Sequence, residues 1–151
     1  MAVDDGLDEQ VGRQIVVGLD GSECSLVALR WAAEQARLTR SPLRAVMTWE
    51  WPRSYGDPVV WPADVSFEDD ARSVLRDSLE KVLGPEAADE VDAEVLEGHP
   101  SVVLRDESRR AALLVVGSRG HGEFAGMLIG SVSEFLATHS HCPIVIVRHT
   151  A

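Results

Sequence analysis

The densest group of residues suited to chemistry is the stretch GSRGHGEFAGMLIGS at 117–131, which holds five glycines. It directly follows the apolar run LLVV at 113–116 and leads into a predicted helix at Ser131. Glycine permits positive φ and close approach of the backbone to a ligand. The free N–H groups at a helix start carry partial positive charge. The stretch therefore predicts a cradle for a polyphosphate, with a tight turn as the alternative.

Two familiar phosphate-binding motifs do not fit this stretch. A Walker A loop ends in Gly-Lys-Ser/Thr, whereas residues 130–132 are Gly-Ser-Val. A dinucleotide fingerprint G-x-G-x-x-G follows the first strand, whereas these glycines follow the fourth predicted strand and have different spacing. Lys81 is the only lysine. We therefore expect phosphate to be held by arginine, backbone N–H groups or hydroxyls.

The elements that must position these residues alternate along the chain. Short apolar runs predict strands near 15–19, 43–49, 91–97, 112–117 and 143–148, with amphipathic helices between them. On the polar face of the first helix, Arg30 and Glu34 are spaced to pair. This βαβαβαβαβ order indicates an α/β fold, with a five-stranded parallel sheet and helices on both faces. Ligands of such sheets lie outside the carboxyl ends of the strands, where strand order reverses.

Composition limits the partners and the cell compartment. The 151 residues are 45% hydrophobic and 26% charged, which is typical of one globular domain, here 14–151 behind an acidic N-terminal tail at 1–13. A net charge of −11 without a basic cluster argues against nucleic acid and membrane partners. Cys24 and Cys142 are far apart, and the N-terminus is acidic rather than basic. We therefore expect a cytoplasmic protein.

The motif G-x2-G-x9-G-S, followed by VSEFLATHSHCPIVIVR, resembles the nucleotide-binding signature of the universal stress protein family. The segment IVVGLDGSECSLVALRWAAEQA resembles the first strand and helix of that family, and the likeness runs from about residue 14 to 148. The resemblance implies a Rossmann-like, adenine nucleotide alpha hydrolase-like domain that forms homodimers. Because the glycine motif is intact, it also implies the ATP-binding branch of the family.

The same resemblance implies the site residues. Those expected around the phosphates are Gly117, Gly120, Gly130 and Ser131. Those expected to line the same loop are Ser118, Arg119, His121, Gly122, Glu123 and Val132. Gly18 and Asp20 would approach the adenosine, with Asp20 bonded to ribose, and the backbone of Thr48 would meet the adenine edge.

Simpler roles compete with several of these assignments. Asp20 could form a turn or a helix cap before Ser22, Ser131 could cap its helix, and His121 could be a solvated loop residue. His139, His141 and Cys142 resemble a metal cluster, but without a fourth ligand nearby a structural turn is favoured.

The carboxylate of Glu123 should repel ATP unless a cation offsets it. Arg119 or a divalent ion could do so, and we therefore expect ATP to bind with Mg²⁺ or Mn²⁺.

These features favour an ATP-binding regulator of the stress response that acts on an unknown protein partner. No catalytic triad or carboxylate pair is evident, so the chain is expected to be at most a weak ATPase. A slow ATPase and a nucleotide-independent dimeric interaction module are the alternatives. The apolar strand at 144–147 is expected to form the homodimer. The tryptophans of loop 49–62 could form an aromatic lid, although burial in the domain or at an interface is favoured.

Overall fold

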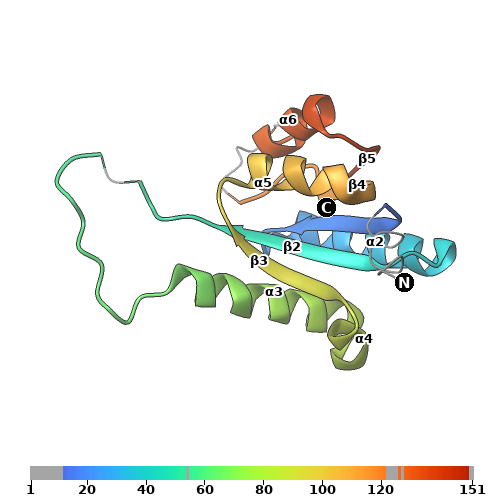
Figure 1. Ribbon diagram of the computed structural model, residues 1–151, viewed down its shortest axis with the longest axis horizontal. Coiled ribbons are helices and arrows are strands. Elements are labelled where there is room, and N and C mark those ends of the chain that lie inside the picture. Colours follow the sequence, from blue (N-terminus) through green and yellow to red (C-terminus); the bar gives the residue numbers. More distant parts are fainter. Residues whose placement is uncertain (1–11, 54, 122–125, 127, 150–151) are drawn as a thin grey trace, which may run out of the picture.

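A five-stranded parallel sheet forms the centre of the protein (Figure 1). The computed structural model describes residues 12–53, 55–121, 126 and 128–149. The strand order is β3-β2-β1-β4-β5, and all four neighbouring pairs are parallel. The strands are β1 (Gln14–Leu19), β2 (Leu43–Trp49), β3 (Asp92–Glu97), β4 (Ala111–Gly117) and β5 (Ile144–Val147). The predicted fold class is confirmed.

Helices cover both faces of this sheet. α2 (Glu23–Thr39) and α3 (Phe67–Leu83) pack on one face, and α4 (Pro85–Asp89) packs against α3. α5 (Pro100–Glu107) and α6 (Ser131–His139) pack on the other face, and a 3-10 turn at Ser108–Arg110 leads into β4. None of the helices in the described ranges is long and apolar enough to cross a membrane.

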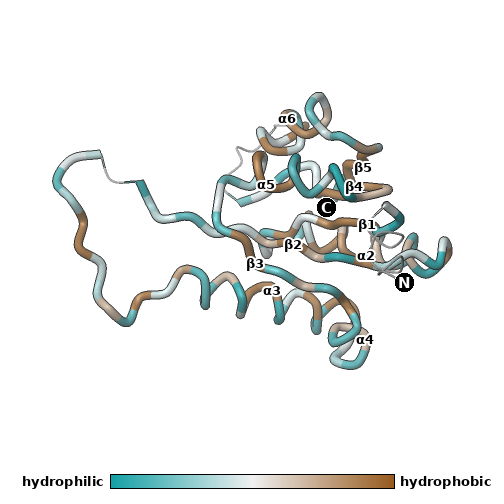
Figure 2. Tube along the Cα trace, in the orientation of Figure 1, coloured by the Kyte–Doolittle hydropathy of each residue, from teal (hydrophilic) through white to brown (hydrophobic). Residues whose placement is uncertain are grey.

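Successive side chains of the strands point to opposite faces and so divide the interior into two cores. Val17, Ala45 and Val115 pack against the small and aliphatic residues of α2 and against α3. Val16, Val46 and Leu114 pack with Leu104 of α5 and Leu136 of α6. Figure 2 shows the resulting apolar colour along β1 and β4. Because both faces are covered, the central strands are apolar without strict alternation.

Local chemistry explains two differences from the predicted helices. Glu34 pairs with Arg37, at 2.6 Å between Oε1 and Nη2, so the predicted pair with Arg30 is wrong. Gly84 adopts φ +85° after α3, and Pro85 then opens the additional short helix α4. Proline fits a first helical position because the N–H it lacks would have no partner there.

The segment between β2 and α3 projects far beyond the carboxyl ends of the strands (Figure 1). Aromatic rings connect its two ends. Trp49 meets Trp51, and both Trp51 and Trp61 meet Phe67, edge to face at centroid distances of 5.1 to 5.7 Å. Tyr55 and Val60, further out, are 95% and 90% exposed. Trp51 and Trp61 thus pack against Phe67 at the base of the segment but stay 49% and 38% exposed. Burial of these two rings in the domain is not observed, and an interface or an aromatic lid stays a prediction.

Candidate functional site

A cleft of about 250 Å³ opens at the carboxyl ends of β1 and β4, where the strand order reverses. Parallel sheets bind ligands at this point because the loops after adjacent strands diverge there. Ligand pockets usually measure roughly 300 to 1,000 Å³. The described walls therefore enclose a small ligand or one part of a larger one.

One end of the cleft is apolar. Val46 and Val116 project into it from β2 and β4, and Leu104 faces them from α5. Gly18 keeps this end open, because a Cβ at that position would lie 2.6 Å from Cδ1 of Leu104. Thr48 lines the same wall from β2. This slot suits a flat ligand group that is apolar on its faces.

The N-terminus of α6 also borders the cleft. Its N-cap is Gly130, which has no side chain to cap the helix. The first backbone bond of the helix runs from the Glu134 N–H to the Gly130 carbonyl at 2.9 Å, so the preceding N–H groups have no partner within the helix. Ser131 and Val132 line the cleft at this end. Such a helix end binds anions. Ser131 is the first helical residue rather than the cap, so the capping role considered for it is wrong.

Ser118 fastens the base of the glycine-rich loop. Its side chain is buried, and Oγ lies 3.5 Å from Sγ of Cys24. Its backbone N–H donates to the Val147 carbonyl at 2.8 Å, and its carbonyl accepts from the Gly130 N–H at 2.5 Å. Ser118 therefore lies beneath the cleft and joins both ends of the loop to β5.

The thiol of Cys24 shares this environment. Burial opposes its ionisation, but hydrogen bonds from Ser118 and from the backbone of Arg119 and His149 lower its pKa below the usual value. Cys24 and Cys142 are both free thiols. The thiol of Cys24 is thus part of the polar packing under the loop.

Asp20 lies where the turn after β1 meets the glycine-rich loop. Its Oδ1 accepts from the N–H of Ser22 at 2.9 Å and from the Ser22 hydroxyl at 2.5 Å, which confirms the predicted turn. Its Oδ2 accepts from the N–H of His121 at 3.1 Å. Partial burial alone would raise the pKa of Asp20, but these hydrogen bonds outweigh it and hold the pKa below its usual value of 3.8. The side chain is therefore a carboxylate at neutral pH.

Most of the predicted site residues lie on this one cleft. The predicted residues that line it are Gly18, Asp20, Thr48, Gly117, Arg119, Gly120, His121, Gly130, Ser131 and Val132. Ser118 lies beneath the cleft, and Gly122 and Glu123 lie outside the described residues. The chain thus brings these segments together from four separate regions of the sequence.

Sequence reasoning missed part of the lining. The residues it did not name are Leu19, Ser25, Val46, Pro100, Leu104, Val116 and Ser133. Val46 could have been found by alternation, because it lies two positions before Thr48 and so on the same face of the strand. Pro100 and Leu104 belong to the helix after β3, a connection that the sequence analysis did not weigh as a ligand-binding loop.

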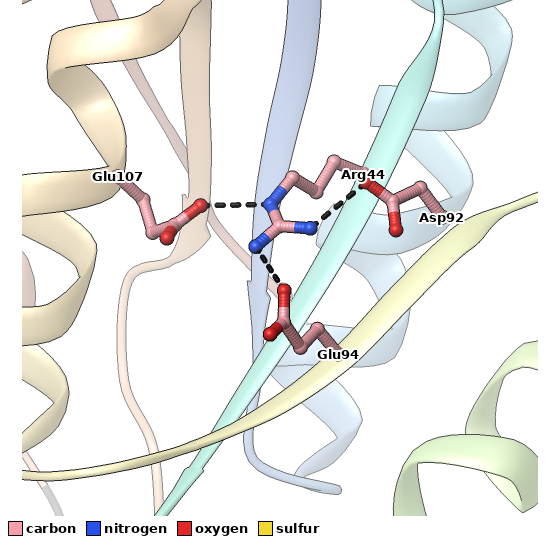
Figure 3. A network of polar contacts seen from close by, with 4 residues as sticks. All are labelled: Arg44, Asp92, Glu94 and Glu107. Atoms are coloured by element: carbon pink, nitrogen blue, oxygen red, sulfur yellow. Dashed lines mark hydrogen bonds and ion pairs between the residues drawn. The ribbon is translucent and has the colours of Figure 1, made fainter.

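The amino ends of the strands carry a separate polar network (Figure 3). The Arg44 guanidinium contacts Glu107 at 2.7 Å, Asp92 at 2.8 Å and Glu94 at 2.5 Å. Burial opposes its charge, but the three carboxylates raise the pKa of Arg44 above its already high usual value. Each acid comes from an element next to β2 or beneath it, so the network ties β3 and α5 to that strand.

The histidines near the end of α6 have local partners. The His139 ring stacks on Phe135 at a centroid distance of 4.1 Å, and its Nδ1 lies 2.8 Å from Oγ1 of Thr138. Within the described ranges, no three His, Cys, Asp or Glu side chains are grouped so that they could hold a metal ion. His139 thus has a packing role at this helix end.

Comparison with known sequences gives a family and several relatives. The model of the Universal stress protein family matches residues 12–148. Universal stress protein Rv2623 of Mycobacterium tuberculosis is 34% identical over 151 aligned residues, which cover 89% of this chain and 47% of that protein. Universal stress protein Rv1996 of the same organism is also 34% identical, with 92% of this chain and 49% of that protein covered. The chain spans about half the length of these curated relatives.

Solved structures share the fold. Universal stress protein UspA from Lactobacillus plantarum superposes with a TM-score of 0.74 at 19% identity, over 91% of this chain and 98% of that one. A universal stress protein in complex with cAMP superposes with a TM-score of 0.62 at 27% identity, over 91% of this chain and 98% of that one. The universal stress protein of Archaeoglobus fulgidus in complex with dAMP superposes with a TM-score of 0.58 at 21% identity, over 91% of this chain and 98% of that one.

Proposed function

Because the chain belongs to the universal stress protein family, we propose that it is an ATP-binding regulatory protein of the stress response. The observation that carries the proposal is the cleft, which is lined by an apolar slot and by the open N-terminus of α6. The slot fits the adenine ring, and the helix N-terminus fits phosphate. Two structural relatives were solved in complex with adenine nucleotides, cAMP and dAMP.

Two glycines of the cleft support the proposal because a side chain at either position would collide with a residue of the cleft lining. A Cβ on Gly18 would meet Leu104, and a Cβ on Gly120 would lie within 2.4 Å of the Asp20 carboxylate. Glycine at both positions therefore lets Leu104 and Asp20 pack directly against the backbone of the cleft wall.

The first test identifies bound and binding nucleotides. Freshly purified protein is denatured and any released nucleotide is identified by chromatography, and ATP, ADP, AMP and cAMP are then titrated into nucleotide-free protein by calorimetry. We expect ATP to be released or to bind. If no adenine nucleotide is released and none binds, the nucleotide-independent interaction module becomes the better description.

We further propose that binding, not hydrolysis, is the main activity. Asp20 is the carboxylate on the described cleft wall, and it accepts hydrogen bonds from Ser22 and His121. It is thus engaged rather than poised to activate water. Incubating the ATP complex and following ADP over hours tests this. Stoichiometric ATP that persists supports a regulator, and steady accumulation of ADP supports the slow ATPase.

ATP is proposed to bind with Mg²⁺ or Mn²⁺. Asp20 already places one carboxylate on the cleft wall, and Glu123 adds a second negative charge in the sequence of the glycine-rich loop. A divalent cation would reduce their repulsion of the phosphates. Titrating ATP with Mg²⁺ and then with EDTA decides the point, because equal affinity in the two titrations would remove the metal from the proposal.

The chain is also proposed to form a homodimer through β5 at residues 144–147 and to act on a protein partner. β5 is an edge strand of the sheet, and its residues are half-buried rather than buried. An edge of apolar residues with unpaired backbone groups favours pairing with a second strand. Such a dimer would couple two nucleotide clefts, since the loop after β4 is bonded to β5 through Ser118.

A further inference from the structure

We propose that Asp20 acts mainly as a positioning residue, whose carboxylate holds the glycine-rich loop in place over the turn after β1. The inference rests on the proposed nucleotide site and assigns Asp20 a role different from ribose binding. It starts from the hydrogen bond between the His121 N–H and Oδ2 of Asp20, which joins residues 101 positions apart in the chain.

Among the described residues of the loop, the backbone bonds that fix it to the sheet lie at its base. Ser118 is bonded to Val147 and to Gly130, where the loop leaves β4 and enters α6. Beyond Ser118, Arg119, Gly120 and His121 run along the cleft wall. The hydrogen bond to Asp20 holds this outgoing segment at its far end.

The two carboxylate oxygens have separate partners. Oδ1 accepts the N–H and hydroxyl of Ser22, which fixes the side chain on its own turn. Oδ2 is then directed at the loop, where it accepts the N–H of His121. Because Ser22 holds one oxygen of the Asp20 carboxylate, the other oxygen can orient the His121 N–H. Hydrogen bonds to a charged carboxylate are stronger than hydrogen bonds between neutral groups.

The packing around Oδ2 leaves little freedom. An added Cβ on Gly120 would lie 2.4 Å from Oδ2, so the loop backbone passes directly against the carboxylate. The His121 ring lies over the same turn, because Nε2 would be 3.6 Å from a Cβ on Gly21. Loop and turn therefore fit together through a glycine on each side, and removing the carboxylate would release the segment that faces the phosphates.

The test variant is Asp20→Asn, which is isosteric and keeps the oxygen that bonds Ser22. Its amide NH₂ would face the His121 N–H, so two donors would meet and the bond would be lost. The matched control is Asp89→Asn, which makes the same chemical change at an exposed carboxylate at the end of α4, on the side of the sheet opposite the cleft. Hydrogen exchange of the His121 amide in nucleotide-free protein reads the restraint directly.

We expect this amide to exchange at least about tenfold faster in Asp20→Asn and at the wild-type rate in Asp89→Asn. Unchanged exchange in Asp20→Asn would overturn the inference. This measurement needs no ligand, so it stands even if the proposed function fails because no nucleotide binds to the wild-type protein.

A second measurement separates the restraint from ribose binding. ATP and 2′,3′-dideoxy-ATP, which lacks both ribose hydroxyls, are titrated into the wild type and Asp20→Asn. If Asp20 acts through the loop, the variant loses the same factor for both nucleotides, about tenfold. If the loss appears with ATP and disappears with the dideoxy analogue, Asp20 acts through the ribose and the inference is wrong.

Discussion

Gly117, the last residue of β4, lies directly against Cys24 in the first turn of α2. A Cβ on Gly117 would be 2.9 Å from the Cys24 carbonyl carbon and 3.0 Å from both its carbonyl oxygen and Sγ. Two of these are backbone atoms, so they cannot move aside as a flexible side chain would. The glycine is therefore needed for packing, apart from any contact with a ligand.

Gly117→Ala should lower the free energy of unfolding by about 1 to 3 kcal/mol, because the added methyl group forces β4 and α2 apart. Urea denaturation followed by circular dichroism measures the change. Gly12→Ala is the control, since a Cβ at Gly12 has no atom within 4 Å. Equal midpoints for the two variants would contradict the packing role.

The Arg44 network leads to a second prediction. Arg44→Met removes the cation between three carboxylates, and the Arg44 side chain is only 13% exposed. We expect the free energy of unfolding to fall by about 1 to 3 kcal/mol. This is less than for a fully buried ion pair, because the three acids are partly solvated. The loss should shrink in about 1 M NaCl, where charges are screened.

Arg72→Met is the matched control for Arg44, because Arg72 and Glu68 form an exposed pair one helical turn apart. Arg72→Met should lower the free energy of unfolding by less than about 0.5 kcal/mol. ATP affinity should not change in Arg44→Met, since the network lies at the amino ends of the strands, opposite the cleft. If the two variants are equally stable, the network contributes nothing beyond an ordinary surface pair.

The sequence predicts the features that depend on residues close together in the chain. Runs such as IVVGL and LLVVG mark buried strands, and the rule for ligands of parallel sheets then points to the loops after the first, second and fourth strands. Ser118 shows the limit of motif spacing, because its neighbours Gly117 and Arg119 line the cleft while its own side chain points to Cys24. The spacing of a motif does not say which side chain faces inward.

Contacts between distant segments could not be predicted in this way. The hydrogen bond from His121 to Asp20 depends on how two loops meet after folding, and neither loop alone contains a signal for it. The same holds for Leu104, which enters the cleft from α5 because that helix packs on β1 and β2. Such contacts follow from the tertiary arrangement and not from any local pattern.

A third prediction concerns pH. The pKa of Asp20 is lower in the folded protein than its usual value of 3.8, so the carboxylate stabilises the fold fully above that pH. Its contribution is then lost as the pH falls through the folded-state pKa. The difference in unfolding free energy between the wild type and Asp20→Asn should therefore be constant from about pH 7 to about pH 5 and decline toward about pH 3. A difference that stays constant over the whole range would show that ionisation of Asp20 has no part in the fold.

A fourth prediction tests the dimer at β5. The carbonyl of Pro143 accepts from Leu114 of β4, and the carbonyl of Val147 accepts from Ser118 just after it. By alternation the backbone of Ile144 and Ile146 therefore faces the free edge. If this edge pairs with a second chain, the Ile146 amide should be protected from hydrogen exchange at high protein concentration. It should exchange rapidly after dilution below the dimer dissociation constant.

Ile146→Pro should convert the dimer to a monomer in sedimentation, since proline removes the N–H that would pair across the edge. Val145→Lys is a poorer test, because Val145 packs against the core beneath α2. The interface lies elsewhere if the Ile146 amide exchanges at the same rate at high and low protein concentration. It also lies elsewhere if Ile146→Pro is folded and still forms a dimer.

The last prediction concerns the anion site at the start of α6. Gly130 has φ −81° and ψ 164°, an extended conformation open to other residues, so Gly130→Asp and Gly130→Asn are both compatible with its backbone. Either side chain can accept the N–H groups that we assign to phosphate, and both variants should therefore bind ATP more weakly than the wild type. Only aspartate adds a negative charge, and it should bind ATP at least about tenfold more weakly than the asparagine variant at low salt. Adenosine, which has no phosphate, should bind the two variants equally well. If ATP also binds them equally, its phosphates do not lie at the N-terminus of α6.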